Sequence, residues 1–220
     1  MSKEPSIFVQ IPAYRDSESI PTIVNMLTQA TIPQRVYIGV CWQYKPNEES
    51  DLLAIPDEYI KQVHYLSFPV DQSKGVTWAR HQAQQMYNGE DYTLMIDSHM
   101  RFVNGWDELL IKQLKACNSK KPIITYHPSA YIPPHKLEKN PKLTILCANY
   151  SNAAGEIRLR GEVLDVTPPT PLRGAFASPA LLFASAKLLD EVPSDPYLYF
   201  EQEEICFSAR LFTHGWDVFH

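Results

Sequence analysis

The chain has 220 residues, of which 45% are hydrophobic and 20% are charged, with a formal net charge of −5 at pH 7. This composition is typical of one packed domain and excludes a disordered chain. Lysine and arginine are not concentrated in any segment, which argues against a nucleic-acid partner and against electrostatic binding to anionic membranes.

The N-terminal run MSKEPSIFVQIPAYRD is too short and too interrupted for a signal peptide or a membrane-spanning helix. No later run reaches the ~20 apolar residues that a span requires. The cysteines lie far apart, without the paired spacing of a structural zinc site; they are Cys41, Cys117, Cys147 and Cys206. We therefore expect reduced thiols and a cytoplasmic protein.

Buried strands and amphipathic helices alternate along the first 126 residues. In chain order the pattern predicts a strand over 6–11, a helix over 20–27, strands over 36–42 and 63–68, a helix from 76 to near 89, a strand over 92–96, a helix over 106–114 and a strand over 122–126. This alternation predicts an α/β fold with a doubly wound, mostly parallel sheet, complete before Pro128. Ligands bind such sheets outside the carboxyl ends of the strands.

Prolines cluster between Pro128 and Pro171, and regular periodicity fades there. We interpret this segment as short antiparallel strands and acceptor-side loops inserted into a single domain, 1–220. Its nucleotide-binding half would be about 1–126 and its acceptor-side half about 127–220. A last helix is predicted to begin at Glu201 and to carry Glu201 and Glu204 in its first turn.

The triplet Asp97-Ser98-His99 directly follows a buried strand. On an extended backbone, residues i and i+2 point the same way, so Asp97 and His99 could face one metal ion. A divalent cation there would offset the charge that gathers on a departing diphosphate, and imidazole beside carboxylate suits Mn²⁺ better than Mg²⁺. The alternative is that Asp97 caps a turn and His99 is an ordinary surface histidine.

The run GVTWARHQAQQMYNGEDYTLMIDSHMRFVNGWDELL resembles a stretch of the polypeptide N-acetylhexosaminyltransferases. A glycine, an Ala-Arg pair on a helix, a turn, an apolar strand and an Asp-x-His triplet come in the same order. The resemblance is strongest to the GlcNAc-transferases that include the cytoplasmic hydroxyproline-linked enzymes, which share the Asp-Ser-His form and the GVCWQ strand at 39–43. The mucin-type GalNAc-transferases are similar more distantly.

This resemblance implies a GT-A fold, a UDP-GlcNAc or UDP-GalNAc donor, Mn²⁺ or Mg²⁺, and retention at the sugar. In similar enzymes the loop after the first strand holds uracil and ribose; here it consists of Pro12, Ala13, Tyr14, Arg15 and Asp16. Arg80 would neutralise phosphate or form a surface ion pair. Gly174 would let its loop approach the donor sugar.

Acidic residues follow an aromatic segment near the predicted last helix. We expect Glu204, and as second choice Glu201, to face the donor sugar or acceptor hydroxyl, although helix-dipole complementation alone also favours acids there. Similar enzymes take a third metal ligand from a late segment, which makes His220 a candidate. Since they usually continue further, we expect instead a truncated chain with an open donor site and His220 poorly ordered or remote from the metal.

The sequence thus predicts a metal-dependent glycosyltransferase that transfers N-acetylglucosamine or a related hexosamine from a UDP-sugar to a hydroxyl of a protein or glycan. One alternative is a nucleotidyltransferase, although the loop PAYRD lacks the glycines and basic residues of a phosphate loop. The other is a truncated, non-catalytic UDP-sugar-binding domain.

Overall fold

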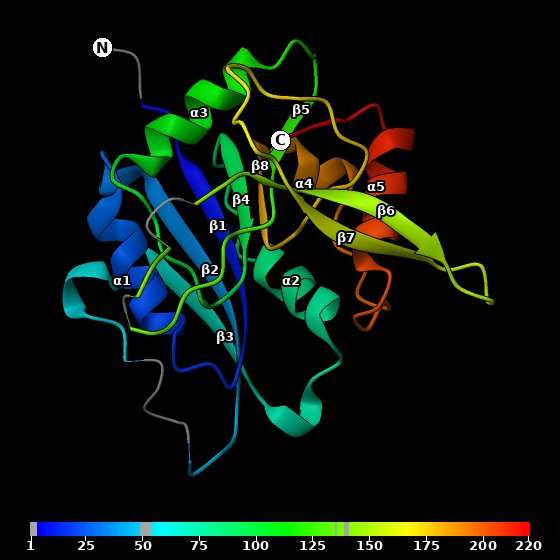
Figure 1. The fold of residues 1–220 in the computed structure, drawn as a ribbon. Helices are drawn as coiled ribbons and strands as arrows, with labels where there is room; N and C mark the ends of the chain where they lie inside the picture. The colour runs from blue at the N-terminus through cyan, green and yellow to red at the C-terminus, as the bar shows by residue number, and fades with distance from the viewer. Residues whose placement is uncertain (1–3, 49–53, 135, 139–140) are drawn as a thin grey trace.

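The computed structural model describes residues 4–48, 54–134, 136–138 and 141–220. Within these residues, seven strands form one sheet in the order β3-β2-β1-β4-β8-β5-β9, with helices on both faces (Figure 1). The pairs β1–β2, β2–β3, β1–β4 and β5–β9 are parallel, whereas β8 runs antiparallel to both of its neighbours. The predicted α/β class with a mostly parallel sheet is confirmed.

The strands predicted before residue 126 are all present. They are β1 (Ile7–Tyr14), β2 (Val36–Tyr44), β3 (Val63–Pro69), β4 (Tyr92–Ile96) and β5 (Pro122–Thr125). β1 continues beyond Pro12, where the sequence predicted its end. Pairing of β1 with β4 stops at Gln10, so Pro12 lies where the strand has one neighbour and a missing N–H is tolerated.

The prediction that the sheet is complete before Pro128 is wrong. β8 (Leu181–Ser185) lies between β4 and β5, and β9 (Asp217–Phe219) adds to the other side of β5. The short apolar run of β8 has no periodicity of its own, and its place in the sheet depends on β5 residues at least 57 positions away and β4 residues at least 85 positions away. The sheet therefore takes strands from both sides of residue 126.

Successive residues of a strand point to opposite faces of the sheet, so the core has one part on each face. Ile7 and Val9 of β1 face α1 (Ser19–Gln29) and α3 (Trp106–Ala116), whereas Phe8 faces the side of α4 (Lys187–Glu191) and α5 (Glu203–Thr213). Helix α2 (Val76–Gln84) also covers this second side, packing Trp78, Ala79 and Ala83 against Cys41 of β2.

Among the helix limits that differ from the sequence prediction are the end of α2 and the start of α5. α2 ends at Gln84 instead of near Gly89, because residues 85–87 continue in i→i+3 hydrogen bonds and Gly89 then takes a positive φ. α5 begins at Glu203, because Gln202 has a left-handed backbone with φ 67°. Glu201 therefore lies before the helix and not in its first turn.

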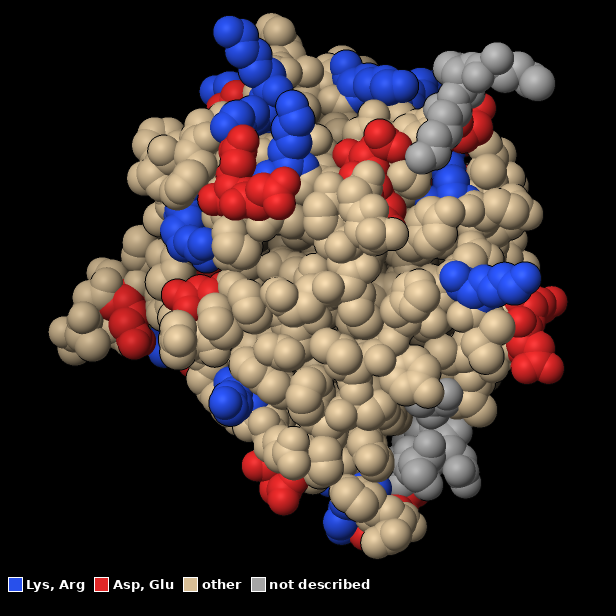
Figure 2. Space-filling model, turned by 180° about the vertical axis from the view of Figure 1, so that it is seen from behind, with Lys and Arg blue, Asp and Glu red and all other residues tan. Residues whose placement is uncertain are grey.

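The expected antiparallel insertion is present. β6 (Thr144–Ser151) and β7 (Ile157–Val163) pair with each other as a hairpin that stands apart from the main sheet (Figure 1). On the face seen in Figure 2, Lys and Arg are scattered around the rim among Asp and Glu. The longest described helices have 11 residues, and none of the described helices has the length and apolarity to cross a membrane.

Candidate active site at the carboxyl edge of the sheet

A pocket of about 420 Å³ lies between the end of β4, the start of α5 and the β6–β7 hairpin. It brings together four of the residues predicted from the sequence, Arg80, Asp97, Glu201 and Glu204. Residues that the sequence analysis did not select also line it, among them His127, Arg158, Arg160, Ser178 and Glu203. The pocket is therefore where a ligand is expected in an open α/β sheet.

Arg80 is buried and forms ion pairs with two acidic residues that line this pocket, Asp97 and Glu203. Its side chain is only 4% exposed; Nη2 donates to Oδ1 of Asp97 at 3.2 Å, and Nε donates to Oε1 of Glu203 at 3.0 Å. Burial lowers the pKa of Arg80, but the carboxylates of Glu203 and Asp97 outweigh burial and hold this pKa above its ordinary value. The guanidinium is thus a buried cation with two carboxylate partners, and not a surface ion pair.

Glu203 is the acid that sequence reasoning missed. It is 8% exposed and lies in the first turn of α5, on the same face as the buried Phe207 and Leu211. Burial raises the pKa of Glu203, and Arg80 acts in the opposite direction. The i, i+4, i+8 spacing of these three residues is a signal in the sequence that could have identified Glu203 as the inward-facing acid.

Glu201 lines the pocket from a different position than predicted. It is exposed and forms an ion pair with Arg158 of β7. Beside it, Nε2 of Gln202 donates to the carbonyl of Ile157 at 3.2 Å. These contacts tie the hairpin to the segment before α5, so the pocket has one wall on the sheet and another on the hairpin.

Asp97 and His99 do not share an extended backbone. β4 ends at Ile96 and the chain bends at Ser98 and His99. The bend is held against α1, because Oγ1 of Thr22 donates to the carbonyl of Ser98 at 2.9 Å and accepts from the amide of Met100 at 2.9 Å. Consequently Asp97 pairs with Arg80, whereas Nδ1 of His99 lies 2.7 Å from Oδ2 of Asp16.

A metal ion would find two suitable donors at this bend. The side chain of His99 is 59% exposed, and only its Nδ1 has a hydrogen-bond partner among the described residues. Asp97 keeps Oδ2 beside the oxygen bound to Arg80. A carboxylate and an imidazole together suit Mn²⁺ better than Mg²⁺, and two protein ligands leave coordination positions open for other donors. The described part of the chain holds no group of three or more His, Cys, Asp or Glu side chains in a metal-binding arrangement.

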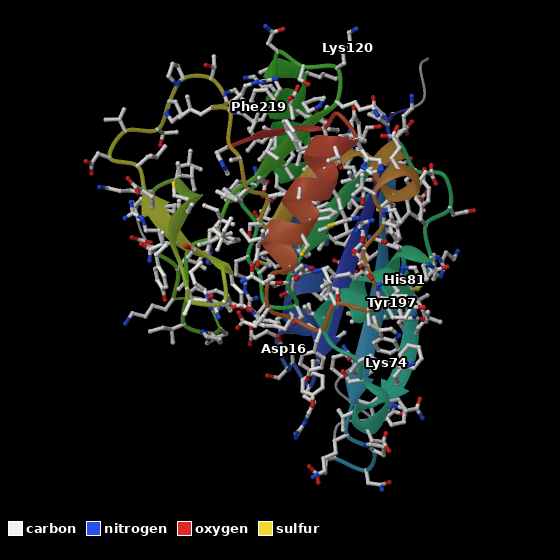
Figure 3. The ribbon with its side chains drawn as sticks, turned by 90° about the vertical axis from the view of Figure 1, so that its right-hand side faces the viewer. Asp16, Lys74, His81, Lys120, Tyr197 and Phe219 are labelled. Carbon is white, nitrogen blue, oxygen red and sulfur yellow. The ribbon has the colours of Figure 1, made fainter. Side chains whose placement is uncertain are left out.

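The loop predicted to bind the nucleotide divides into buried and exposed residues. Pro12 and Ala13 are buried within β1, whereas Tyr14, 55% exposed, and Arg15 lie at the surface. Asp16 follows where β1 ends (Figure 3) and turns inward. Burial raises the pKa of Asp16, but hydrogen bonds from His99, Ser98 and the Glu18 amide lower it to about 2.

Gly174 approaches a histidine ring. A Cβ at this position would lie 2.1 Å from Nε2 of His220. His220 is buried directly after β9, with Nδ1 2.7 Å from the carbonyl oxygen of Thr125. Neither residue is among those that line the pocket. In Figure 3, Phe219, next to His220, lies well apart from Asp16.

The start of α2 is hydrogen-bonded to the segment that precedes α5. The amide of Val76 donates to the carbonyl of Tyr199 at 3.0 Å, and Oγ1 of Thr77 donates to the carbonyl of Leu198. Further along, Gln84 exchanges two 3.0 Å hydrogen bonds with Ser194. α2 thus anchors residues 194–200, the segment that leads into the acids of the pocket.

Comparison with known proteins identifies the family and the fold. The family described as Glycosyltransferase (GlcNAc) matches residues 6–60 and 56–220. A search of curated proteins found no match. Among solved structures, the crystal structure of GalNAc-T7 with UDP, GalNAc and Mn²⁺ has a TM-score of 0.69 at 14% identity, covering 100% of this chain and 43% of that one. The crystal structure of S. aureus TarS 1-349 has a TM-score of 0.54 at 13% identity, covering 97% and 57%.

The two solved structures establish the fold, and the chain spans about half the length of each. Both are glycosyltransferases of GT-A type, so the predicted GT-A-like architecture is confirmed. The family match covers nearly the whole chain and includes Arg80, Asp97 and the acids before and within α5. The chain belongs to the glycosyltransferase family described as Glycosyltransferase (GlcNAc).

Proposed function

We propose that this chain is the donor-binding domain of a glycosyltransferase that transfers N-acetylglucosamine, or a related hexosamine, from a UDP-sugar to a hydroxyl of a protein or glycan. The observation that carries the proposal is the pocket at the carboxyl edge of the sheet, which Asp97 and Glu204 line together with the buried Arg80–Glu203 pair. Family membership supports the transfer reaction, and the GalNAc-T7 structure with UDP, GalNAc and Mn²⁺ supports the donor and metal classes.

Asp97 and His99 would hold the Mn²⁺ or Mg²⁺ ion. A bound divalent cation offsets the negative charge of the diphosphate leaving group. Arg80 fixes one oxygen of Asp97 and so leaves the other for the metal. Arg80 itself is already neutralised by Asp97 and Glu203, which makes it a residue that positions Asp97 and not a direct phosphate ligand.

The uridine would lie beside Tyr14 and Arg15, the exposed residues of the predicted nucleotide loop. An aromatic ring such as that of Tyr14 can stack on a base. Glu204, in the first turn of α5, would contact hydroxyls of the sugar or stabilise positive charge at the anomeric carbon, in keeping with a retaining reaction. The acceptor would enter on the hairpin side, where Glu201 meets Arg158.

A nucleotide panel tests this function. With Mn²⁺ present, UDP should raise the melting temperature more than GDP, CDP or ADP, because a ligand that binds only the folded state stabilises it. Asp97→Asn should weaken Mn²⁺-dependent UDP binding at least tenfold, about 1.4 kcal/mol, in calorimetry. Asp165→Asn, the same change at an exposed residue outside the pocket, should bind UDP like the unchanged protein.

Two results would contradict the proposal in different ways. Equal thermal shifts with GDP or ADP would remove the uridine assignment and favour the nucleotidyltransferase alternative. Tight UDP binding without any hydrolysis of UDP-GlcNAc or UDP-GalNAc would favour a non-catalytic binding domain. A direct comparison of UDP-GlcNAc with UDP-GalNAc in calorimetry then identifies the preferred sugar.

A further inference from the structure

Asp16 is the centre of a hydrogen-bond cluster that connects the end of β1 with the bend after β4. Its Oδ2 lies 2.6 Å from Oγ of Ser98, which donates to it, and 2.7 Å from Nδ1 of His99. Its Oδ1 accepts from the amide of Glu18 at 2.9 Å. Both carboxylate oxygens are therefore used within the protein, although the sequence predicted that Asp16 faces the nucleotide.

The contact with Asp16 determines how His99 can bind a metal ion. A carboxylate oxygen accepts hydrogen bonds, so Nδ1 of His99 must carry the proton. In the neutral ring Nε2 then has the lone pair, and it has no hydrogen-bond partner among the described residues. A carboxylate that holds one imidazole nitrogen while the other binds metal is a recurring arrangement, which fixes the ring and makes it a stronger ligand.

The surroundings keep this carboxylate in place. The backbone carbonyl of Asp16 accepts from Oγ of Ser19, at the start of α1, at 2.9 Å. Thr22, one turn later, holds the bend at Ser98 and Met100. The backbone segments that carry Asp16 and His99 are thus both anchored to α1, and the contact with Asp16 is the one that orients the ring of His99 among the described residues.

We propose that Asp16 is a positioning residue of the metal site, which holds Nδ1–H of His99 and thereby presents Nε2 to the divalent cation, and that it does not bind the nucleotide. This inference rests on the proposed function, because His99 has a metal to bind only if that function holds. The role of Asp16 thereby changes from binding uridine, as the sequence predicted, to orienting the metal ligand His99. The role differs from that of Asp97, which would touch the metal directly.

The first test needs no metal. In ¹⁵N-labelled, metal-free protein at pH 8, long-range ¹H–¹⁵N spectra should show His99 as the Nδ1–H tautomer, and Asp16→Ala should change it to a mixture of tautomers. An Nε2–H tautomer in the unchanged protein overturns the proposal. Ser98→Ala removes a different hydrogen bond to the same carboxylate and should leave the tautomer of His99 as it was.

The second test measures the metal and the nucleotide separately. Asp16→Ala should weaken Mn²⁺ binding, measured by electron paramagnetic resonance, by roughly 10–100-fold, as is usual for the loss of such a support. UDP affinity measured with EDTA should stay within about twofold. Circular dichroism and the melting temperature of Asp16→Ala and Ser98→Ala establish that both are folded. Asp16→Leu, which keeps a branched side chain but has no acceptor for Nδ1–H of His99, replaces Asp16→Ala if the latter is not.

These outcomes separate the two hypotheses. Unchanged Mn²⁺ affinity in a folded Asp16 variant overturns the positioning role and leaves the proposed function intact. Loss of UDP affinity in EDTA assigns Asp16 to the nucleotide, as the sequence first predicted. If the unchanged protein binds no Mn²⁺, the metal-dependent function fails and the positioning role fails with it, whatever tautomer the spectra show.

Discussion

Arg80 is the counter-charge of two acidic residues of the pocket, Asp97 and Glu203. A buried guanidinium between Asp97 and Glu203 leaves neither carboxylate without a counter-charge, although Glu203 is almost wholly enclosed. Removing one partner of a buried ion pair is strongly destabilising, because the charge that stays behind is neither solvated nor paired.

We therefore expect Arg80→Met to lower the free energy of unfolding at pH 7 by about 3–5 kcal/mol in urea titrations. The double variant Arg80→Met/Glu203→Gln should recover a large part of this loss, since no buried unpaired charge remains at Glu203. A double variant no more stable than the single one would show that Glu203 does not depend on Arg80.

The loss in Arg80→Met should also depend on pH. Burial already raises the pKa of Glu203, and without Arg80 its remaining charged neighbours, Asp97 and Glu204, raise it further. A carboxyl whose pKa is higher in the folded state binds more protons there than in the unfolded state. The free energy of unfolding therefore falls as the pH rises above 4.5, the pKa of the carboxyl in the unfolded chain. The deficit of the variant should thus be largest at pH 7 and shrink toward pH 4.5; a constant deficit would contradict this explanation.

At the scale of elements, hydrogen bonds from α2 hold residues 194–200 in place. Gly75 opens α2 with φ +101°, and a Cβ there would lie 2.2 Å from the carbonyl oxygen of Tyr199. The residue must be glycine for both reasons, the positive φ and the close approach of another backbone. Since Phe200 and Glu201 come next and line the pocket, the shape of the pocket depends on this contact.

Gly75→Ala should therefore be more destabilising than Gly89→Ala. Gly89 also has a positive φ, +87°, but a Cβ there would meet nothing within 4 Å. Both variants place alanine at a positive φ, which costs about 1–2 kcal/mol or more. Gly75, with ψ 175°, also lies in a backbone region that is essentially confined to glycine, and its Cβ would collide with Tyr199. The excess loss in Gly75→Ala therefore reports both effects and should be at least about 1 kcal/mol in urea unfolding. Equal losses would mean that the start of α2 and residues 194–200 adjust freely to the new side chain.

For the whole molecule, the two sheets differ in how firmly they are held. β1, β4 and β8 each have strand neighbours on both sides and are buried, whereas β6 and β7 have only each other and are largely exposed. We expect the amides of β1, β4 and β8 to exchange only when much of the protein unfolds. Those of β6 and β7 should exchange through local opening of the hairpin.

Hydrogen exchange followed by mass spectrometry should show this division. Backbone amides of β1, β4 and β8 should exchange roughly a hundredfold or more slowly than those of β6 and β7, which corresponds to about 2.8 kcal/mol in opening free energy. UDP with Mn²⁺ should slow exchange near Asp97 more than in β3. Equal protection in both sheets would mean that the hairpin is an integral part of the main core.

The sequence by itself determined the local elements and the site's main acidic residue. Runs of β-branched residues and helical spacing are local properties, so β1 to β5, α1, α2 and α3 were predictable, with limits that differ by a few residues. The position of Asp97 at the end of β4 followed in the same way, because the carboxyl ends of parallel strands meet at one edge.

Only the tertiary structure decided which distant groups meet. β8 joins the sheet through pairing with β4, a contact that no local pattern encodes. Asp16 meets His99 across 83 positions and Arg80 meets Glu203 across 123, so both partners depend on the packing of α1 and α5 against the sheet. A buried charge needs a counter-charge, but which residue supplies it is fixed by the fold and not by spacing along the chain.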